Sequence, residues 1–284
     1  MIKIDSLEQI KEIERSGELI GEFDIDDKIY HHKDCPGISR SKLKTMLRSY
    51  NHYLYQEMKE TKALLVGRAL HDAILMDNLD QYITFDGDRR TKAGKAEYAE
   101  MQESGKTFLD KVDLAIVKGI YKAVNEHMTC RNIMKDATNE RAFFWRDHDT
   151  GILCKCKPDI LKRDMGIIAD IKSTDDARQS AFIRSVTKFD YDMQAAFYLD
   201  GVNAFLGEDT VKHFIFIGCE KFTPFEIGLY VLDQDSVTTG REVYKEALKY
   251  YKNCLEKADK EKGYSKQIRT ISLASWAQDI NNRI

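Results

Sequence analysis

The stretch from Lys157 to Thr174 constrains the fold of this chain more than any other. Two apolar segments flank a turn at Asp164-Met165-Gly166, a pattern that predicts a β-hairpin. Residues two apart on a strand share a face, so we expect Asp170 and Lys172 to point the same way. Asp159, on the preceding strand, can lie beside them. Two carboxylates and an ammonium on one face suit a site for a hard cation and a phosphate.

The hairpin also has a plain structural interpretation. Asp170 and Lys172 could form a solvated ion pair on an edge strand, and Asp159 could be a turn residue. In either case Ala169 and Ile171 are expected to point into the core. The short motif leaves both interpretations open, so the distant residues must decide between them.

Composition narrows the class of protein. A chain of 284 residues can bury a large core, and no apolar run approaches the ~20 residues that cross a bilayer. The N-terminus shows no apolar segment before a cleavage site, so we expect a cytoplasmic protein without a membrane partner. A net charge of −3 excludes a uniformly basic nucleic-acid binder but allows a local basic channel. The six cysteines show no C-x-x-C pair and are expected to be reduced thiols.

The N-terminal half reads mainly as helices. Ser39 or Ser41 caps a helix on which basic and aromatic residues alternate, among them Arg40 and Lys42. This pattern suits a nucleic-acid backbone, and it equally suits a solvated helix face. Residues 77–106 are expected to be irregular and basic, either a solvated loop or a lid that contacts phosphates.

The segment Leu64–Met76 predicts an amphipathic helix that carries a histidine. His71 lies one turn after Gly67, which we expect to allow a close backbone approach. A lone histidine on an apolar surface is usually a core residue. The alternative is a metal ligand that projects from the helix toward the hairpin.

From Glu140 onward the pattern changes to strands, then to a mixture of strands and helices. We expect three strands in a meander, followed by two helices, two strands and a long helix. The resulting prediction is an α/β domain with a mixed sheet and a helical N-terminal part. The expected elements are strands at Glu140–Arg146, Ile152–Leu161 and Ile167–Thr174, helices at Asp175–Lys188 and Tyr191–Phe205, strands at Lys212–Cys219 and Pro224–Leu232, and a helix at Ser236–Lys260.

Several motifs in a fixed order resemble those of a known family. They are Gly37-Ile38-Ser39-Arg40-Ser41, Gly67-x-x-x-His71, Glu140, Pro158-Asp159, Asp170-Ile171-Lys172 and Gln194-x-x-x-Tyr198. Together they resemble the nuclease domain of the RecE (exonuclease VIII) family, in the RecB-like branch of the PD-(D/E)xK nuclease superfamily. The resemblance extends from roughly residue 30 to residue 235. Each motif alone is weak, whereas the ordered set is specific.

The resemblance implies a restriction-endonuclease-like core with a mixed central sheet flanked by helices. We expect one nuclease domain over residues 1–284. Within it, residues 1–138 would form a mostly helical part with His71, residues 139–235 the catalytic sheet core, and residues 236–284 a C-terminal helix and tail.

The resemblance also assigns roles to residues. It implies metal ligation by His71, Asp159, Asp170 and the Ile171 carbonyl, and catalytic roles for Lys172, Glu140, Gln194 and Tyr198. From the basic residues of the N-terminal half we expect DNA contacts by Arg40, Lys42, Arg68, Arg89, Arg90 and Lys92. Lys172 would orient or deprotonate the attacking water. The metal would be Mg²⁺, with Mn²⁺ as a competent substitute because a histidine is an unusual ligand for so hard an ion.

The activity implied is a 5′→3′ exonuclease that degrades linear double-stranded DNA and leaves 3′ single strands. Its partners would be DNA ends, a single-strand annealing recombinase of RecT or Bet type, and further copies in a ring-shaped homo-oligomer. The setting would be recombination in a bacterial cell, with the gene carried by a phage or prophage.

Three alternatives stay open. A DNA-end-binding module with a decayed nuclease site is disfavoured by the intact Asp159, Asp170 and Lys172. An endonuclease or repair nuclease of the same superfamily would share these motifs, although no G-x-x-x-x-G-K-[ST] sequence indicates an attached P-loop motor. An acyl-transfer enzyme is disfavoured because no cysteine lies in a recognisable nucleophile context.

Overall fold

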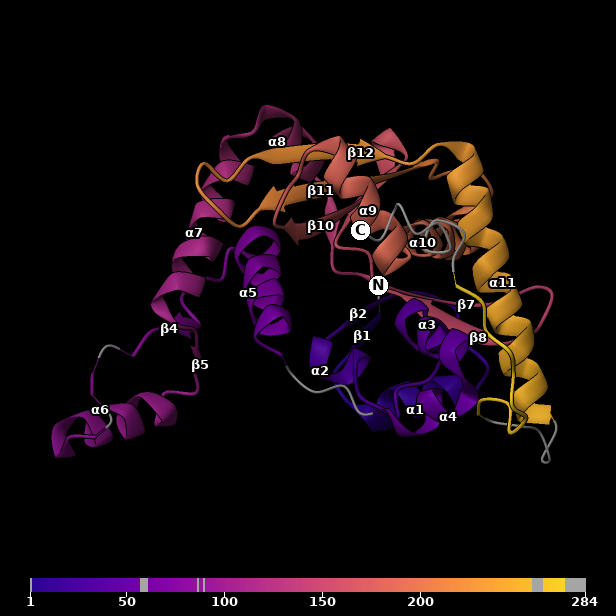
Figure 1. Ribbon diagram of the computed structural model, residues 1–284, viewed down its shortest axis with the longest axis horizontal. Coiled ribbons are helices and arrows are strands. Elements are labelled where there is room, and N and C mark those ends of the chain that lie inside the picture. Colours follow the sequence, from indigo (N-terminus) through magenta and orange to yellow (C-terminus); the bar gives the residue numbers. More distant parts are fainter. Residues whose placement is uncertain (1, 57–60, 86, 89, 257–262, 274–284) are drawn as a thin grey trace.

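The computed structural model describes residues 2–56, 61–85, 87–88, 90–256 and 263–273. Within these ranges the chain forms two five-stranded sheets, a two-stranded ribbon and helices that cover both sheets (Figure 1). Helices alternate with strands along the chain, and both larger sheets are mixed, as expected for an α/β protein. No helix among the described residues is long and apolar enough to cross a membrane.

The first sheet joins the N-terminal segment to the middle of the chain. Its strand order is β1-β2-β7-β8-β3, and β2, β7 and β8 pair antiparallel. The two outer pairs, β1 with β2 and β3 with β8, are parallel. The strands are β1 Ile2–Ile4, β2 Gly21–Ile25, β7 Ala142–Arg146, β8 Leu153–Cys156 and β3 Ile38–Ser39.

The second sheet contains the predicted hairpin. Its order is β12-β11-β10-β9-β6, with β9 and β10 antiparallel and β10 and β11 parallel. A one-turn 3₁₀ helix and Gly166, which has a φ of +64°, make the hairpin turn. The hairpin is therefore confirmed. The strands are β12 Ile227–Val231, β11 His213–Glu220, β10 Ile167–Thr174, β9 Ile160–Lys162 and β6 Thr138–Asn139.

The predicted three-stranded meander is wrong. The segment expected as one strand, Ile152–Leu161, is two strands in different sheets, because β8 ends at Cys156 and β9 begins at Ile160. Pro158 lies between them and has no N–H to give to a sheet ladder, so a continuous strand is interrupted here. The chain passes from the first sheet to the second at Asp159.

Alternate residues of β10 face two different groups of helices, one on each side of the second sheet. Ile168 belongs to a core that includes Phe197 of α10, whereas Ala169 and Ile171 face a core with α5 and α7. Asp170 and Lys172 share the side of Ile168. The main helices are α3 Arg40–Arg48, α5 Lys62–Met76, α7 Lys111–Glu126, α8 Met128–Met134, α9 Gln179–Phe189, α10 Tyr191–Leu206 and α11 Gln234–Glu256; α1 Leu7–Arg15, α2 Asp27–Tyr30 and α4 Tyr50–Tyr55 lie near the first sheet (Figure 1).

The segment 77–106 is more ordered than its polar composition suggests. It contains α6 Lys92–Glu103, which extends away from both five-stranded sheets on a ribbon of β4 Tyr82–Ile83 and β5 Thr107–Phe108 (Figure 1). Thr91 caps α6 by accepting a hydrogen bond from the Gly94 N–H at 3.0 Å. The expectation of an irregular loop is therefore wrong for α6.

Two helical glycines differ in what surrounds them. Contrary to the expected close approach, no atom of the described residues, apart from the chain neighbours of Gly67 and the backbone of α5, lies within 4 Å of the position that a Cβ on Gly67 would take. A Cβ on Gly201 in α10 would lie 2.4 Å from the Trp145 ring. Trp145 is buried and contacts Phe197, with 4.8 Å between ring centroids, so it cannot easily move.

This contrast predicts opposite effects of the same substitution. Gly201→Ala should lower the free energy of unfolding by about 1–3 kcal/mol, because the added methyl overpacks α10 against Trp145. Gly67→Ala should raise it by up to about 1 kcal/mol, because alanine favours the helix and meets no neighbour. Denaturant unfolding of both variants checks this, and a stabilised Gly201→Ala would contradict the packing.

Candidate functional site

Asp170 and Lys172 lie side by side on β10 and face α10. The Asp170 side chain is only 2% exposed, and its Oδ1 accepts a hydrogen bond from Gln194 Nε2 at 2.5 Å. Its Oδ2 pairs with the Lys172 ammonium, but it accepts no hydrogen bond of good geometry and is fully buried. One oxygen of Asp170 is therefore fixed by the helix, and the other has unused capacity for a ligand.

Asp159 is fixed by the hairpin itself. It precedes β9, is 6% exposed, and its Oδ2 accepts a hydrogen bond from the Ile171 N–H at 2.8 Å. Burial and the neighbouring charge of Asp170 raise the pKa of Asp159 to about 7. The Ile171 amide thus orients Asp159, while the predicted role of the Ile171 carbonyl as a metal ligand stays a prediction.

His71 reaches the same place from α5. Its Nε2 lies 3.4 Å from Asp159 Oδ2, and its Nδ1 lies 3.5 Å from Glu140 Oε1. Burial would lower the pKa of His71, but Asp159 and Glu140 outweigh it and raise the pKa to about 10. The imidazole belongs to a charged cluster and not to an apolar core.

Glu140 is not the strand residue expected from the sequence. It lies between β6 and β7 with a φ of +53°, in the left-handed region, and its N–H donates to the Asp159 carbonyl at 3.1 Å. A residue with a Cβ pays about 1 kcal/mol or more for this conformation. The turn directs the Glu140 carboxylate toward His71 instead of along β7.

These groups fit a divalent cation. His71, Glu140 and Asp159 each offer a ligand atom, and the three atoms lie within 4.8 Å of one another. Asp170 is not one of these three groups, but its charge acts on His71 and on Asp159, and its Oδ2, which pairs with Lys172, is a further carboxylate oxygen near them. A set dominated by carboxylates with one imidazole suits Mg²⁺ or Mn²⁺ better than a soft metal.

Lys172 is held on two sides. Besides Asp170, its Nζ lies 4.9 Å from the ring centroid of Tyr191, a residue at the start of α10 to which the sequence assigned no role. Burial would lower the pKa of Lys172, but the charges of Asp170 and Asp159 raise it. The side chain is therefore an ammonium that faces the carboxylates.

Gln194 and Tyr198 share a face of α10, as their spacing predicts. Gln194 contacts Asp170 directly, whereas Tyr198 packs edge-to-face on Phe214 with 6.0 Å between centroids. Burial raises the pKa of Tyr198 well above its usual range, so the hydroxyl is neutral. A role for Tyr198 at the phosphate stays a prediction.

Five of the six predicted DNA-binding residues lie in the described part of the chain, on α3, on α5 and near the start of α6. The Arg40 guanidinium donates to the carbonyls of Phe189 and Asp190, where α9 meets α10, so it braces the helix that carries Gln194. Lys42 is half-buried on α3, and Arg68 is exposed on α5. Arg90 pairs with Asp88 at 3.2 Å and Lys92 is the first residue of α6, whereas Arg89 lies outside the described residues.

Two further charged residues at the cluster had no role assigned from the sequence. The Lys157 ammonium pairs with Asp27 of α2 and lies 3.1 Å from Glu140 Oε2. Burial would lower the pKa of Lys157, but Glu140 and Asp27 raise it. Lys157 precedes the Pro158-Asp159 motif and could have been suspected, whereas Asp27 is 130 positions away from it and carried no signal.

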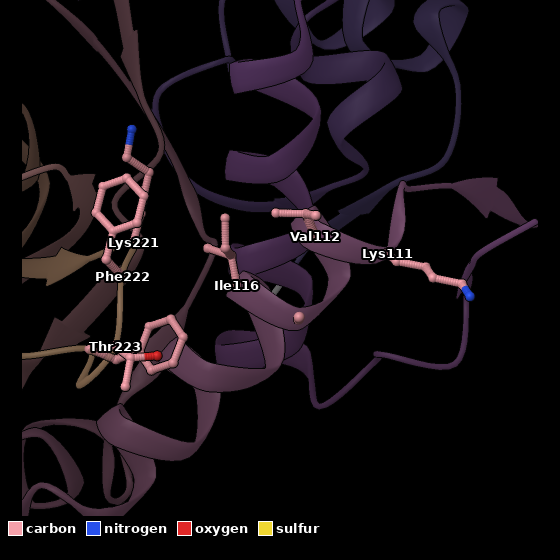
Figure 2. Close-up of a pocket in the computed structure, with 8 residues that line it drawn as sticks. Lys111, Val112, Ile116, Lys221, Phe222 and Thr223 are labelled. Atoms are coloured by element: carbon pink, nitrogen blue, oxygen red, sulfur yellow. The ribbon is translucent and has the colours of Figure 1, made fainter.

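An apolar hollow of about 370 Å³ lies elsewhere on the molecule (Figure 2). It is formed by the start of α7 and the connection between β11 and β12. None of the carboxylates of the cluster lines it, so the hollow and the charged site are separate features. Its lining residues are Lys111, Val112, Ala115, Ile116, Lys221, Phe222, Thr223 and Phe225.

Comparison with known proteins agrees with this arrangement. The sequence pattern of a family described as "PDDEXK-like domain of unknown function (DUF3799)" matches residues 39–272. The crystal structure of a protein described as a candidate exonuclease from Eubacterium rectale superposes with a TM-score of 0.59 at 16% identity, covering 90% of this chain and 98% of the other. The family match and the shared fold confirm the restriction-endonuclease-like core.

Other comparisons add little. The crystal structure of SSO0001 covers 69% of this chain and 88% of the other at 16% identity, but its TM-score of 0.29 is too low to indicate a shared fold. No curated protein sequence matches the chain.

In the metal-free protein, we expect removal of one buried carboxylate charge to stabilise the fold. The folded pKa of Asp159, about 7, exceeds its ordinary value of 3.8, so the protein loses stability as the pH rises from about 4 to about 7, and the full cost of the ionised carboxylate is present above that range. At mildly alkaline pH we expect Asp159→Asn to raise the free energy of unfolding by about 1–2 kcal/mol. Thermal melts with a chelator measure this, and added Mn²⁺ should then stabilise the original protein but not the variant.

A matched control separates repulsion from burial. Asp113 is also 6% exposed, but it lies beside Lys62 at 3.2 Å instead of beside another carboxylate. Asp113→Asn should therefore bring no gain in stability. If Asp159→Asn melted below the original protein, crowding of like charges at the site would be contradicted.

Proposed function

Since this chain belongs to the family of PDDEXK-like domains, a nuclease fold, we propose that it is a metal-dependent 5′→3′ exonuclease acting on linear double-stranded DNA. The observation that carries the proposal is the convergence of Asp170 and Lys172 with Asp159, His71 and Gln194. These residues come from β10, the β8–β9 connection, α5 and α10. Their types match the chemical needs of phosphodiester hydrolysis.

The chemistry divides among these groups. A divalent cation, when bound by His71, Glu140, Asp159 and Asp170, would neutralise phosphate charge and make water a better nucleophile. Asp170 is held for this role by Gln194, and Asp159 is held by the Ile171 amide. The residues thus place carboxylate oxygens without moving, which favours catalysis by preorganisation.

Lys172 supplies a positive charge beside the carboxylates. Its ammonium lies between Asp170 and the Tyr191 ring, so it is aimed at the cluster and restricted in rotation. A protonated lysine here suits a role in orienting water and stabilising negative charge on the phosphate. We propose Mg²⁺ as the resident ion, with Mn²⁺ able to replace it because His71 contributes nitrogen.

The polarity, the ring-shaped oligomer and the annealing recombinase remain parts of the proposal. Their support is the ordered motif set that resembles the RecE family, together with the exonuclease description of the Eubacterium rectale protein. The setting we propose is phage-type recombination in a bacterial cytoplasm. The convergence of Asp159, Asp170 and Lys172 favours an active enzyme over a DNA-end-binding module with a decayed site.

End-labelled DNA tests the activity and its direction. With Mg²⁺, a linear duplex labelled at its 5′ ends should release label at once, whereas a duplex labelled at its 3′ ends should retain it on long single strands. Covalently closed circular duplex should stay intact. Cutting of the circle would favour an endonuclease, and early release of the 3′ label would overturn the proposed polarity.

Substitutions test the site. Lys172→Ala and Asp170→Asn should each reduce the rate of hydrolysis by about a hundredfold or more, because each removes charge stabilisation at the phosphate. Lys245→Ala is a matched control, since Lys245 also pairs with a carboxylate, that of Asp149 at 2.8 Å, but lies on α11. Activity that survived both site substitutions would overturn the assignment.

A further inference from the structure

Lys157 occupies a position between the charged cluster and the N-terminal segment. Its side chain is 9% exposed, and its ammonium contacts Asp27 Oδ1 on one side and Glu140 Oε2 on the other, the latter at 3.1 Å. The other oxygen of Glu140, Oε1, faces His71 at 3.5 Å. Lys157 therefore orients the Glu140 carboxylate, because it holds one oxygen and leaves the other facing His71.

Asp27 comes from a part of the chain that the family match does not include. It lies on α2, within residues 1–38, whereas the match begins at residue 39. The same segment is attached to the core at other points, for example by Asp24, which pairs with Arg141 at 2.6 Å. Attachment of the segment therefore does not depend on Asp27 alone.

The charge on Lys157 has two opposing effects on a cation bound by Glu140. The ammonium orients the Glu140 carboxylate. It is also a positive charge close to the site, so it repels the cation that would bind there. Asp27 offsets this, because it shares the ammonium and holds it on the outer side of Glu140. Without Asp27, the ammonium would pair with Glu140 alone and compete with the cation for that carboxylate.

We propose that Asp27 is a positioning residue that tunes the metal site through Lys157, so that the N-terminal segment sets the affinity of the site for its divalent cation. This rests on the proposed function only in that the cluster binds a cation. Partners of ligand residues, one contact removed from the metal, commonly change metal affinity by about 10–100-fold when they are replaced.

Titration calorimetry with Mn²⁺ on the full chain, without DNA, tests the proposal. Asp27→Asn should weaken Mn²⁺ binding about tenfold, because the Lys157 charge is no longer shared. The double variant Asp27→Asn with Lys157→Met should regain most of the loss, since the competing ammonium is gone.

Asp24→Asn is the matched control for attachment of the segment. Asp24 and Asp27 are similarly exposed, 43% and 50%, and each pairs with a cation of the core, but the partner of Asp24 is Arg141 instead of Lys157. Asp24→Asn should leave Mn²⁺ binding within about twofold, even if it lowers the melting temperature as much as Asp27→Asn does.

The outcomes separate this proposal from the proposed function. If the original chain binds Mn²⁺ and Asp27→Asn binds it equally well, the role of Asp27 is overturned and the nuclease site stands. If the double variant is as weak as Asp27→Asn, or Asp24→Asn is equally weak, Asp27 acts through structure and not through Lys157. If the original chain binds no Mn²⁺, both proposals fall.

Discussion

The constraint on which the site depends is the repulsion among three carboxylates crowded into a mostly buried space. Like charges that are close together and buried destabilise the folded state unless each has its own compensating contact. Each acid here has one: Asp170 has Gln194 and Lys172, Asp159 has the Ile171 amide and His71, and Glu140 has Lys157. Burial and the charge of Asp170 still raise the pKa of Asp159, and a bound cation would relieve both effects.

The fold brings the acids together by placing them where the chain changes sheets. The break at Pro158 separates β8 from β9, so Asp159 lies at the junction and not within a strand. β10 then carries Asp170 past this junction, and α10, packed on β7 and β8 of the first sheet, presents Gln194 from the other side. Arg40 braces the start of α10. A site built between two sheets in this way is held by elements from most of the chain.

The sequence predicted the parts of this arrangement that local periodicity controls. Strand alternation placed Asp170 and Lys172 on one face, and the i, i+4 spacing placed Gln194 and Tyr198 on one side of α10. It did not predict that Ile152–Leu161 would split, because an apolar run does not record which sheet its strands join. The positive φ of Glu140 and the contact of Asp27 with Lys157 were also out of reach, since both depend on tertiary packing. α6 was missed because a polar helix with little apolar face resembles a loop.

Crystallographic location of a bound ion would test whether these carboxylates form a metal site. Crystals of the full chain soaked in Mn²⁺ would reveal the ion through its anomalous scattering. We predict a strong peak at ligand distance from Asp159 and Asp170, with His71 as a nitrogen ligand. A peak elsewhere, or ordered density for the cluster with no ion at saturating Mn²⁺, would contradict a metal-dependent site built on these carboxylates.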